Sequence, residues 1–128
     1  VLGLTSNTGS QNFEQQKLVS GQFLYESVLE QVAGWGSSDQ LMFVVGATKA
    51  EDFTSIRKII PDHFLLVPGV GAQGGSLSDV TKYGKNSQVG LLVNASRAVI
   101  FASGGTDFAE KAAIAASEYA AEMKALLA

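Results

Sequence analysis

The sequence predicts an α/β fold in which strands and helices alternate around a parallel sheet. Four short apolar runs have the length and composition of buried strands, and each is followed by a segment with helical spacing of apolar residues. No antiparallel hairpin signal joins two of these runs. Strict alternation of strands and helices is typical of parallel sheets, because a parallel connection needs a crossover segment. We therefore expect four consecutive strand–helix units.

The first unit begins with an apolar run at residues 1–4 that ends in small polar residues. The polar, glutamine-rich stretch 9–20 lacks periodicity and predicts an excursion loop. A helix is expected over 22–33, with Gly34 as its stop signal. Trp35 follows the stop, and because no polar group is arranged around it, we expect it to pack over the helix end.

The second unit consists of an apolar strand at 41–47 and a helix that ends near Ile60. Thr48 and Glu51 have the spacing of a capping box, so the sequence predicts that this helix begins at Thr48. The single histidine, His63, stands just before the third apolar run. Because His63 stands at the start of a strand, whereas parallel α/β sheets bind their ligands where strands end, we expect it to have a structural role.

The third unit contains the most informative stretch, an apolar strand that runs directly into a glycine-rich turn. The unbroken run 64–67 suits a strand buried on both faces, and Pro68 removes an N–H group where the ladder should stop. Glycines follow at positions 69, 71, 74 and 75, a density that lets the backbone approach a ligand and aim N–H groups at an anion. Ser76 and Asp79 then have the spacing of a cap for a helix over 77–83.

The turn also matches the dinucleotide fingerprint G-x-G-x-x-G, but its surroundings argue against that interpretation. The fingerprint needs a longer helix after the glycines and an acidic residue after the next strand, about 20 residues on. Here the next strand, 90–94, ends in an amide. A tight turn without any ligand is the alternative. Gln73 favours a ligand, because a plain turn does not need a glutamine.

In the fourth unit, the strand at 90–94 is followed by a second apolar run at 98–102. That run could be a strand by pattern alone, but we expect a short helix that begins at Ser96 and Arg97, because a helix N-terminus there could bind phosphate. A long alanine-rich helix is expected over 106–127. Its apolar stripe is predicted to contain Phe108, Ala112, Ala116, Tyr119 and Met123.

Composition excludes several classes of function. The chain has 128 residues, 46% of them apolar, and a net charge of −3 with scattered basic residues, which argues against a nucleic-acid partner. No apolar run is long enough to predict a membrane span. With no cysteine and one histidine, the sequence predicts neither a metal site nor a disulfide framework, and it favours a cytoplasmic location.

Four motifs together resemble the orotidine 5′-phosphate decarboxylase family in its longer bacterial form. Along the chain these motifs are Leu4–Gly9, Phe43–Thr48, Pro68–Gly75 and Leu91–Ala98, which is also their order in the family. The resemblance implies that residues 1–128 form the C-terminal half, strands 5–8, of a single (β/α)8 TIM-barrel domain. Because the chain begins inside an apolar run, we interpret it as a fragment whose N-terminal half barrel is absent, and which closes against a piece of similar size.

The resemblance also implies a reaction, the decarboxylation of orotidine 5′-monophosphate to UMP in de novo pyrimidine biosynthesis, without a cofactor and as a homodimer when complete. It assigns Arg97 to the phosphate, Gln73 to both phosphate and pyrimidine, and Ser6 to the pyrimidine ring. Pro68 would line the pocket near the leaving carboxylate. The full set of expected substrate contacts is Ser6, Pro68, Gly71, Gln73, Gly74, Ser96 and Arg97.

The family's catalytic lysine and aspartate array, Asp-x-Lys-x-x-Asp with a further lysine, does not occur in this chain. Asp79 and Lys82 have the wrong spacing and lie on a predicted helix. We therefore expect no catalytic residue here, and expect the chain alone to be inactive. Two alternatives remain open: a non-catalytic half barrel that binds a phosphate ligand, and another phosphosugar-binding TIM barrel.

Overall fold

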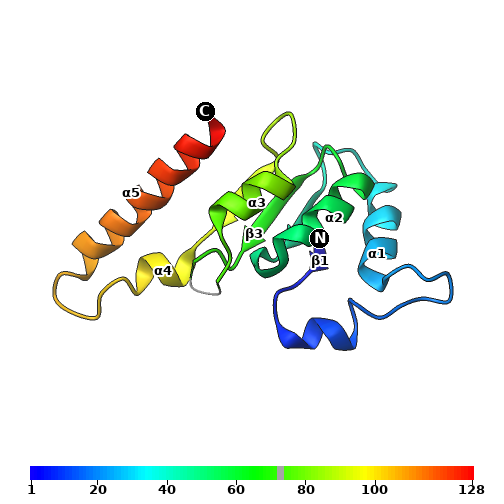
Figure 1. Cartoon of the computed structure of the whole chain (residues 1–128), viewed down its shortest axis with the longest axis horizontal. Coiled ribbons are helices and arrows are strands. Elements are labelled where there is room, and N and C mark those ends of the chain that lie inside the picture. Colours follow the sequence, from blue (N-terminus) through cyan, green and yellow to red (C-terminus); the bar gives the residue numbers. More distant parts are fainter. Residues whose placement is uncertain (72–73) are drawn as a thin grey trace.

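A computed structural model describes residues 1–71 and 74–128, and it confirms the α/β fold with a parallel sheet (Figure 1). All three strand pairings are parallel, and the strands lie side by side in chain order. The strands are β1 (Leu2–Leu4), β2 (Met42–Val45), β3 (Phe64–Pro68) and β4 (Leu91–Asn94). Neither β1 nor β4 pairs with a further strand within the described residues, so both edges of the sheet are open.

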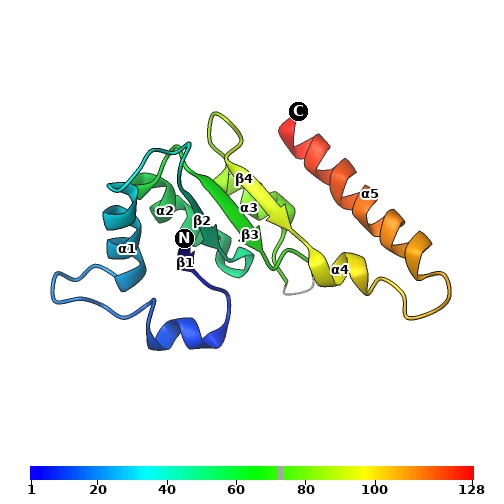
Figure 2. The same cartoon turned by 180° about the vertical axis from the view of Figure 1, so that it is seen from behind.

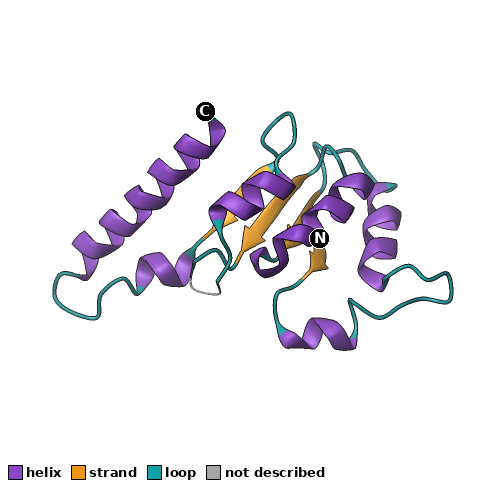
Figure 3. Ribbon diagram, in the orientation of Figure 1, coloured by secondary structure: helices purple, strands orange, loops and turns teal. Residues whose placement is uncertain are grey.

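Helical segments follow every strand, as Figure 3 shows. The α-helices are α1 (Leu24–Ala33), α2 (Phe53–Ile59), α3 (Leu77–Gly84), α4 (Ser96–Ile100) and α5 (Phe108–Leu127). Two 3-10 helices, η1 (Thr8–Asn12) and η2 (Ala47–Asp52), lie in the connections after β1 and β2. The run at 98–102 is therefore helical in its first part, as predicted, and not a fifth strand. Across the described ranges, no helix is both long and apolar enough to cross a membrane.

Only one face of the sheet is covered, and the prediction of a strand buried on both faces is wrong for β3. Leu65 and Val67 are fully buried beneath the helices, whereas Phe64, on the opposite face, is partly exposed. Leu92 of β4 also points to the open face, where 52% of it is exposed. In Figure 1 α2 and α3 lie in front of the sheet, and in Figure 2 the strands themselves face the viewer. The open face follows from a single helical layer.

Helix α1 forms nearly as predicted. The backbone N–H of Phe23 donates to the Glu26 carboxylate at 2.9 Å, which satisfies a donor at the helix start, and the chain turns at Gly34. Leu29 lies fully buried on its inner face. The packing role predicted for Trp35 is wrong, since 77% of its surface is exposed. No described segment of the chain covers the turn at which it stands.

The capping box predicted at Thr48 is also wrong. The helical segment begins one residue earlier as η2, with Gly46 in the extended N-cap position, so position 48 already lies inside a helical turn. Lys49 has non-helical angles, φ −126° and ψ 71°, and interrupts the segment before regular α2 begins at Phe53. The predicted end near Ile60 is confirmed, since Ile60 is the C-cap of α2.

Arg57 of α2 ties together the segments that lead into β3 and β4. Its guanidinium donates to five backbone carbonyl oxygens, those of Gly84 (2.6 Å), His63 (2.6 Å), Gly90 (2.8 Å), Ile60 (3.2 Å) and Pro61 (3.4 Å). Burial lowers the pKa of Arg57 to about 10, against the opposing field of Asp62, so the side chain remains charged at neutral pH. The sequence analysis did not identify this residue.

His63 lies at the same end of the sheet, where the strands begin. The residue is 9% exposed, and its ring packs edge-on against Phe43, with the centroids 5.3 Å apart. Neither ring nitrogen has a hydrogen-bond partner within the described residues. This position matches the expected structural role.

The third and fourth units end in helices of very different burial. Ser76 caps α3, its Oγ accepting the Asp79 N–H at 3.3 Å, as predicted. Helix α5 begins at Phe108 and has no fully buried residue. Its predicted stripe is only partly right, because Phe108 is 60% exposed and Ala116 is exposed as well. The half-buried side chains of the helix are Ala112, Ala115, Tyr119, Met123 and Leu126.

Candidate functional site

The candidate site lies at the edge of the sheet where all four strands end. Because the strands are parallel, the segments that leave them meet at this edge, which is the lower edge in Figure 1. Ser6 follows β1, Pro68 ends β3, and Ser96 with Arg97 opens α4 after β4. Parallel strands therefore place these four residues at the same edge of the sheet.

Three of the predicted residues, Pro68, Ser96 and Arg97, line one pocket of about 180 Å3 between the ends of β3 and β4. The Ser96 hydroxyl donates to Asn94 Oδ1 at 2.7 Å, which links the end of β4 to the first turn of α4. Arg97 is exposed to solvent. A guanidinium beside the first N–H groups of a helix, which have no intrahelical acceptor, suits an anionic ligand such as a phosphate.

The glycine turn has the backbone conformation predicted, but three of its described N–H groups are already used in hydrogen bonds within the turn. Gly69, Gly71 and Gly74 have φ of 94°, 76° and 85°, a region that favours glycine. The N–H of Gly71 donates to Gly75 O at 2.9 Å, that of Gly74 to Gly71 O at 2.8 Å, and that of Gly75 to Gly69 O at 3.3 Å. These three groups therefore stabilise the turn itself and are not aimed at an anion. Gln73 lies outside the described residues.

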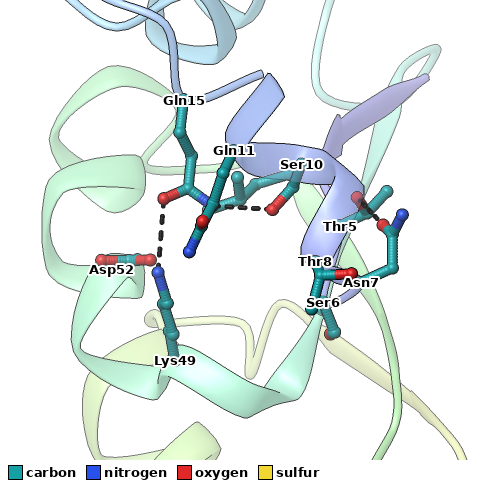
Figure 4. A pocket seen from close by; sticks show the side chains of 11 residues that line it. Thr5, Ser6, Asn7, Thr8, Ser10, Gln11, Gln15, Lys49 and Asp52 are labelled. Carbon is teal, nitrogen blue, oxygen red and sulfur yellow. Dashed lines mark hydrogen bonds between the residues drawn. The ribbon is translucent and has the colours of Figure 1, made fainter. Parts of the chain in front are cut away.

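Ser6 lines a second pocket, of about 200 Å3, above the ends of β1 and β2 (Figure 4). Its Oγ is buried and has no hydrogen-bond partner among the residues that the structure describes. Gly46 lies directly against it, so that a Cβ at position 46 would overlap the Ser6 hydroxyl. The glycine thus makes room for a buried hydroxyl that can still donate or accept one hydrogen bond.

The chain just before Ser6 is fixed by Glu14, which the sequence analysis missed. The Glu14 carboxylate accepts from the backbone N–H of Thr5 at 2.6 Å and from the Thr5 hydroxyl at 2.8 Å. The same hydroxyl lies 2.5 Å from Asn7 Oδ1. No local motif marks Glu14, because its contact depends on the loop returning over the end of β1.

The opposite wall of the Ser6 pocket carries charged side chains, as Figure 4 shows. Lys49 Nζ donates to Gln15 Oε1 at 3.3 Å. Burial raises the pKa of Asp52, and the positive charge of Lys49 opposes that rise. Within the described residues, no group of three His, Cys, Asp or Glu side chains could hold a metal ion.

The pockets around Ser6 and Arg97 have no lining residue in common. They lie at opposite ends of the same edge, with β2 and β3 between β1 and β4. A ligand that touches both residues must therefore span the width of the sheet. The side chains present would suit an anionic group near Arg97 and a hydrogen-bonding group near Ser6.

No family model matches the chain, but individual proteins do over nearly its whole length. It is 57% identical over 127 residues to an orotidine 5′-phosphate decarboxylase of Flavobacterium johnsoniae, and 51% identical over 127 residues to one of Porphyromonas gingivalis. Each match covers 99% of this chain and 46% of the relative. The chain thus spans about half the length of the curated relatives it matches.

Solved structures give the same result for the fold. The OMP decarboxylase of Leishmania donovani superimposes with a TM-score of 0.81 at 30% identity, covering 98% of this chain and 46% of that one. The UMP synthase of the same organism gives a TM-score of 0.82 at 34% identity, covering 98% of this chain and 27% of that one. The family resemblance and the α/β fold of four consecutive βα units predicted from sequence are both confirmed.

Proposed function

We propose that this chain supplies the phosphate- and pyrimidine-binding half of an orotidine 5′-phosphate decarboxylase, the family that it resembles along 99% of its length. In this proposal residues 1–128 are the C-terminal half of one TIM-barrel domain, strands 5–8 of eight. The observation that carries the proposal is the 57% identity to the Flavobacterium johnsoniae enzyme. The polar groups at one edge of the sheet, the Ser6 hydroxyl and the Arg97 guanidinium, also support it, because they suit a substrate that carries a pyrimidine ring and a phosphate.

Arg97 binds the phosphate of orotidine 5′-monophosphate in the proposed complex. Its guanidinium can make a bidentate, charge-assisted contact, and the start of α4 adds N–H groups on the same side of the pocket. Ser96 contributes by fixing that turn through its bond to Asn94. Pro68, on the other wall of this pocket, gives it an apolar side.

Ser6 binds the pyrimidine ring in the same proposal. A buried hydroxyl without a partner in the described chain gains a hydrogen bond when an imide or carbonyl group of the ring arrives. Gln73 is proposed to bridge ring and phosphate, and Gly71 and Gly74 to shape the turn beside it. Ser6 and Arg97 line separate pockets at opposite ends of the sheet edge, so in this proposal the ring and the phosphate occupy different ends of the site.

The reaction replaces the bond between the ring carbon and its carboxylate by a bond to a proton, which gives UMP and carbon dioxide. A group that destabilises the carboxylate and a proton donor are needed, and the lysine and aspartate array expected for these roles is not in this sequence. The chain's own residues bind and orient the substrate. The open edges at β1 and β4 and the half-exposed sheet face are where an N-terminal half barrel would complete the fold. A homodimer and a cytoplasmic location remain predictions.

A hybrid enzyme tests the proposal. This chain replaces the matching 127 residues of the Flavobacterium johnsoniae relative, and decarboxylation of orotidine 5′-monophosphate is followed by loss of substrate absorbance. We expect an active hybrid. A folded hybrid that binds UMP without turnover would favour the non-catalytic half barrel, and one that binds neither substrate nor UMP would favour another phosphosugar barrel.

The role of Arg97 is tested in the same hybrid with orotidine 5′-monophosphate and with orotidine, which has no phosphate. Arg97→Ala should lower kcat/KM for the phosphorylated substrate. The fall should correspond to a loss of about 2–3 kcal/mol in the free energy of transition-state binding. The substitution should leave kcat/KM for orotidine nearly unchanged. Lys111→Ala removes an exposed positive charge on α5 and serves as the control. Equal losses on both substrates would mean that Arg97 does not bind the phosphate.

A further inference from the structure

Tyr119 of α5 lies against the glycine turn that follows β3. Its ring lies so close to Gly71 that a Cβ at position 71 would overlap the Tyr119 hydroxyl and stand 3.2 Å from Cζ. Ala98 of α4 meets the same point, with its Cβ at 3.4 Å. Three segments far apart in the sequence therefore converge on one place.

The two segments that Tyr119 contacts are those that carry the proposed phosphate site. Gly71 belongs to the turn that begins at Pro68, and Ala98 is the residue next to Arg97 in α4. Pro68 and Arg97 line the pocket itself, and the tyrosine ring lies against the two segments that carry them. Ala98 and Tyr119 also line a cavity of about 330 Å3 together with Ala115, between α4 and α5.

Helix α5 is anchored at few points, which gives this contact its weight. The helix has no fully buried residue, and its side chains that pack against the core cluster are Tyr119, Met123 and Leu126. A tyrosine has few rotatable bonds, so it fixes the surfaces that it touches at a low cost in side-chain entropy. Gly71 already needs glycine for its φ of 76°, and the tyrosine adds a second, steric requirement at this position.

We infer that Tyr119 is a positioning residue for the phosphate site, because its ring holds the Gly71 turn and the Arg97-bearing helix α4 at a fixed separation. The inference rests on the proposed function for the meaning of that site. Tyr119 does not touch the substrate in this view. It acts through the two backbone segments between which the phosphate is bound.

The kinetic test uses the hybrid enzyme described above. Tyr119→Ala should raise KM for orotidine 5′-monophosphate about tenfold while kcat changes less than about twofold, because loosened binding elements weaken ground-state and transition-state binding alike. kcat/KM for orotidine should be unchanged. Tyr119→Phe keeps the ring and should stay within about twofold of the unsubstituted hybrid.

Met123→Ala is the matched control, one turn further along the same half-buried stripe and not among the three nearest neighbours of a Cβ at position 71. If Met123→Ala raises KM as much as Tyr119→Ala does, the docking of α5 as a whole matters, and the specific role of Tyr119 is overturned. An equal loss with orotidine in Tyr119→Ala would overturn it as well.

A double-mutant cycle covers the case in which Tyr119→Ala does not fold. Gly71→Ala should weaken substrate binding, and adding Tyr119→Phe should recover part of that loss, since the hydroxyl is the atom that the new Cβ would overlap. Strictly additive effects would contradict a direct contact between the two positions.

Amide hydrogen exchange without substrate separates this inference from the proposed function. The N–H groups of Gly71 and Gly75 donate within the turn, so Tyr119→Ala should speed their exchange at least about tenfold, and Met123→Ala should not. Unchanged exchange would overturn the role of Tyr119 even if Arg97 proves to bind phosphate. If exchange is faster but Arg97→Ala affects both substrates equally, Tyr119 still positions the turn, and only the assignment of the phosphate to this site is refuted.

Discussion

The two ends of the parallel sheet differ in how their polar groups are satisfied. At the end where strands begin, Arg57 donates to five backbone carbonyls from three segments, and His63 packs tightly on Phe43. At the end where strands finish, the Ser6 hydroxyl has no partner in the described chain and Arg97 stands in solvent. The first end holds the fold together, and the second keeps unused hydrogen-bonding capacity, which we propose serves a ligand. We therefore expect mutations to separate stability from binding.

Arg57→Met should give the largest loss of stability. Removing the guanidinium leaves several carbonyls without a donor at a partly buried place, which should lower the free energy of unfolding of the hybrid protein by about 3–4 kcal/mol. Urea denaturation measures this loss, and kcat/KM of the folded fraction should change little. Lys58→Met removes the neighbouring exposed charge and should cost less than about 0.5 kcal/mol. Similar losses in both variants would contradict the view that Arg57 ties these segments together.

Ser6→Ala tests the opposite end of the sheet and should separate the two properties. Deleting a buried hydroxyl that has no partner in the described chain should leave the free energy of unfolding unchanged or raise it by about 1 kcal/mol. The same change should weaken UMP binding, measured by isothermal titration calorimetry, by about 1 kcal/mol or more. A destabilised protein with unaltered UMP affinity would reverse the comparison at this residue.

The smallest expected effect is a pH dependence of stability that comes from His63. Burial lowers the pKa of His63, with the charge of Arg57 acting in the same direction and that of Asp62 opposing them. Below the unfolded-state pKa of about 6.5, the unfolded chain binds a proton that the folded chain resists, so stability should fall as pH drops from 7 toward 5. Each unit of pKa depression corresponds to about 1.4 kcal/mol.

The control for this effect is His63→Leu. It should reduce the slope of the unfolding free energy against pH, measured by urea titrations at several pH values. Identical slopes with and without the histidine would show that its protonation does not differ between the two states.

The sequence was sufficient for the strands and for most helices because their signals are local. Apolar runs bounded by glycine, proline or small polar residues gave all four strands, and the Ser76 cap was correct. The Thr48 capping box failed because the same motif occurs inside helical turns, and only the extended backbone at Gly46 shows where η2 begins. Trp35 was misjudged because the burial of an aromatic residue depends on neighbours that the chain brings from elsewhere.

The candidate site was predictable in its position and less so in its details. Parallel strands place their ends on one edge, so Ser6 and Arg97 could be assigned to the same side from the sequence. Their location in two pockets depends on the strands between them, and no motif reports that separation. Positive φ at Gly71 follows from residue type, but the direction of its N–H group does not. Arg57 and Glu14 were missed because their partners are backbone groups brought close only by the tertiary fold.

The order of the strands also has a consequence for how the chain folds. Strand β1 shifts register against β2 and is joined to it by the longest of the three connections, residues 5–41. Closing a longer loop costs more entropy, and an irregular ladder returns less enthalpy for it. We therefore expect β2, β3 and β4 to assemble first and β1 to dock in the final step. Ser6, directly after β1, would then reach its place only when folding is nearly complete, so the pyrimidine end of the proposed site would mature later than its phosphate end.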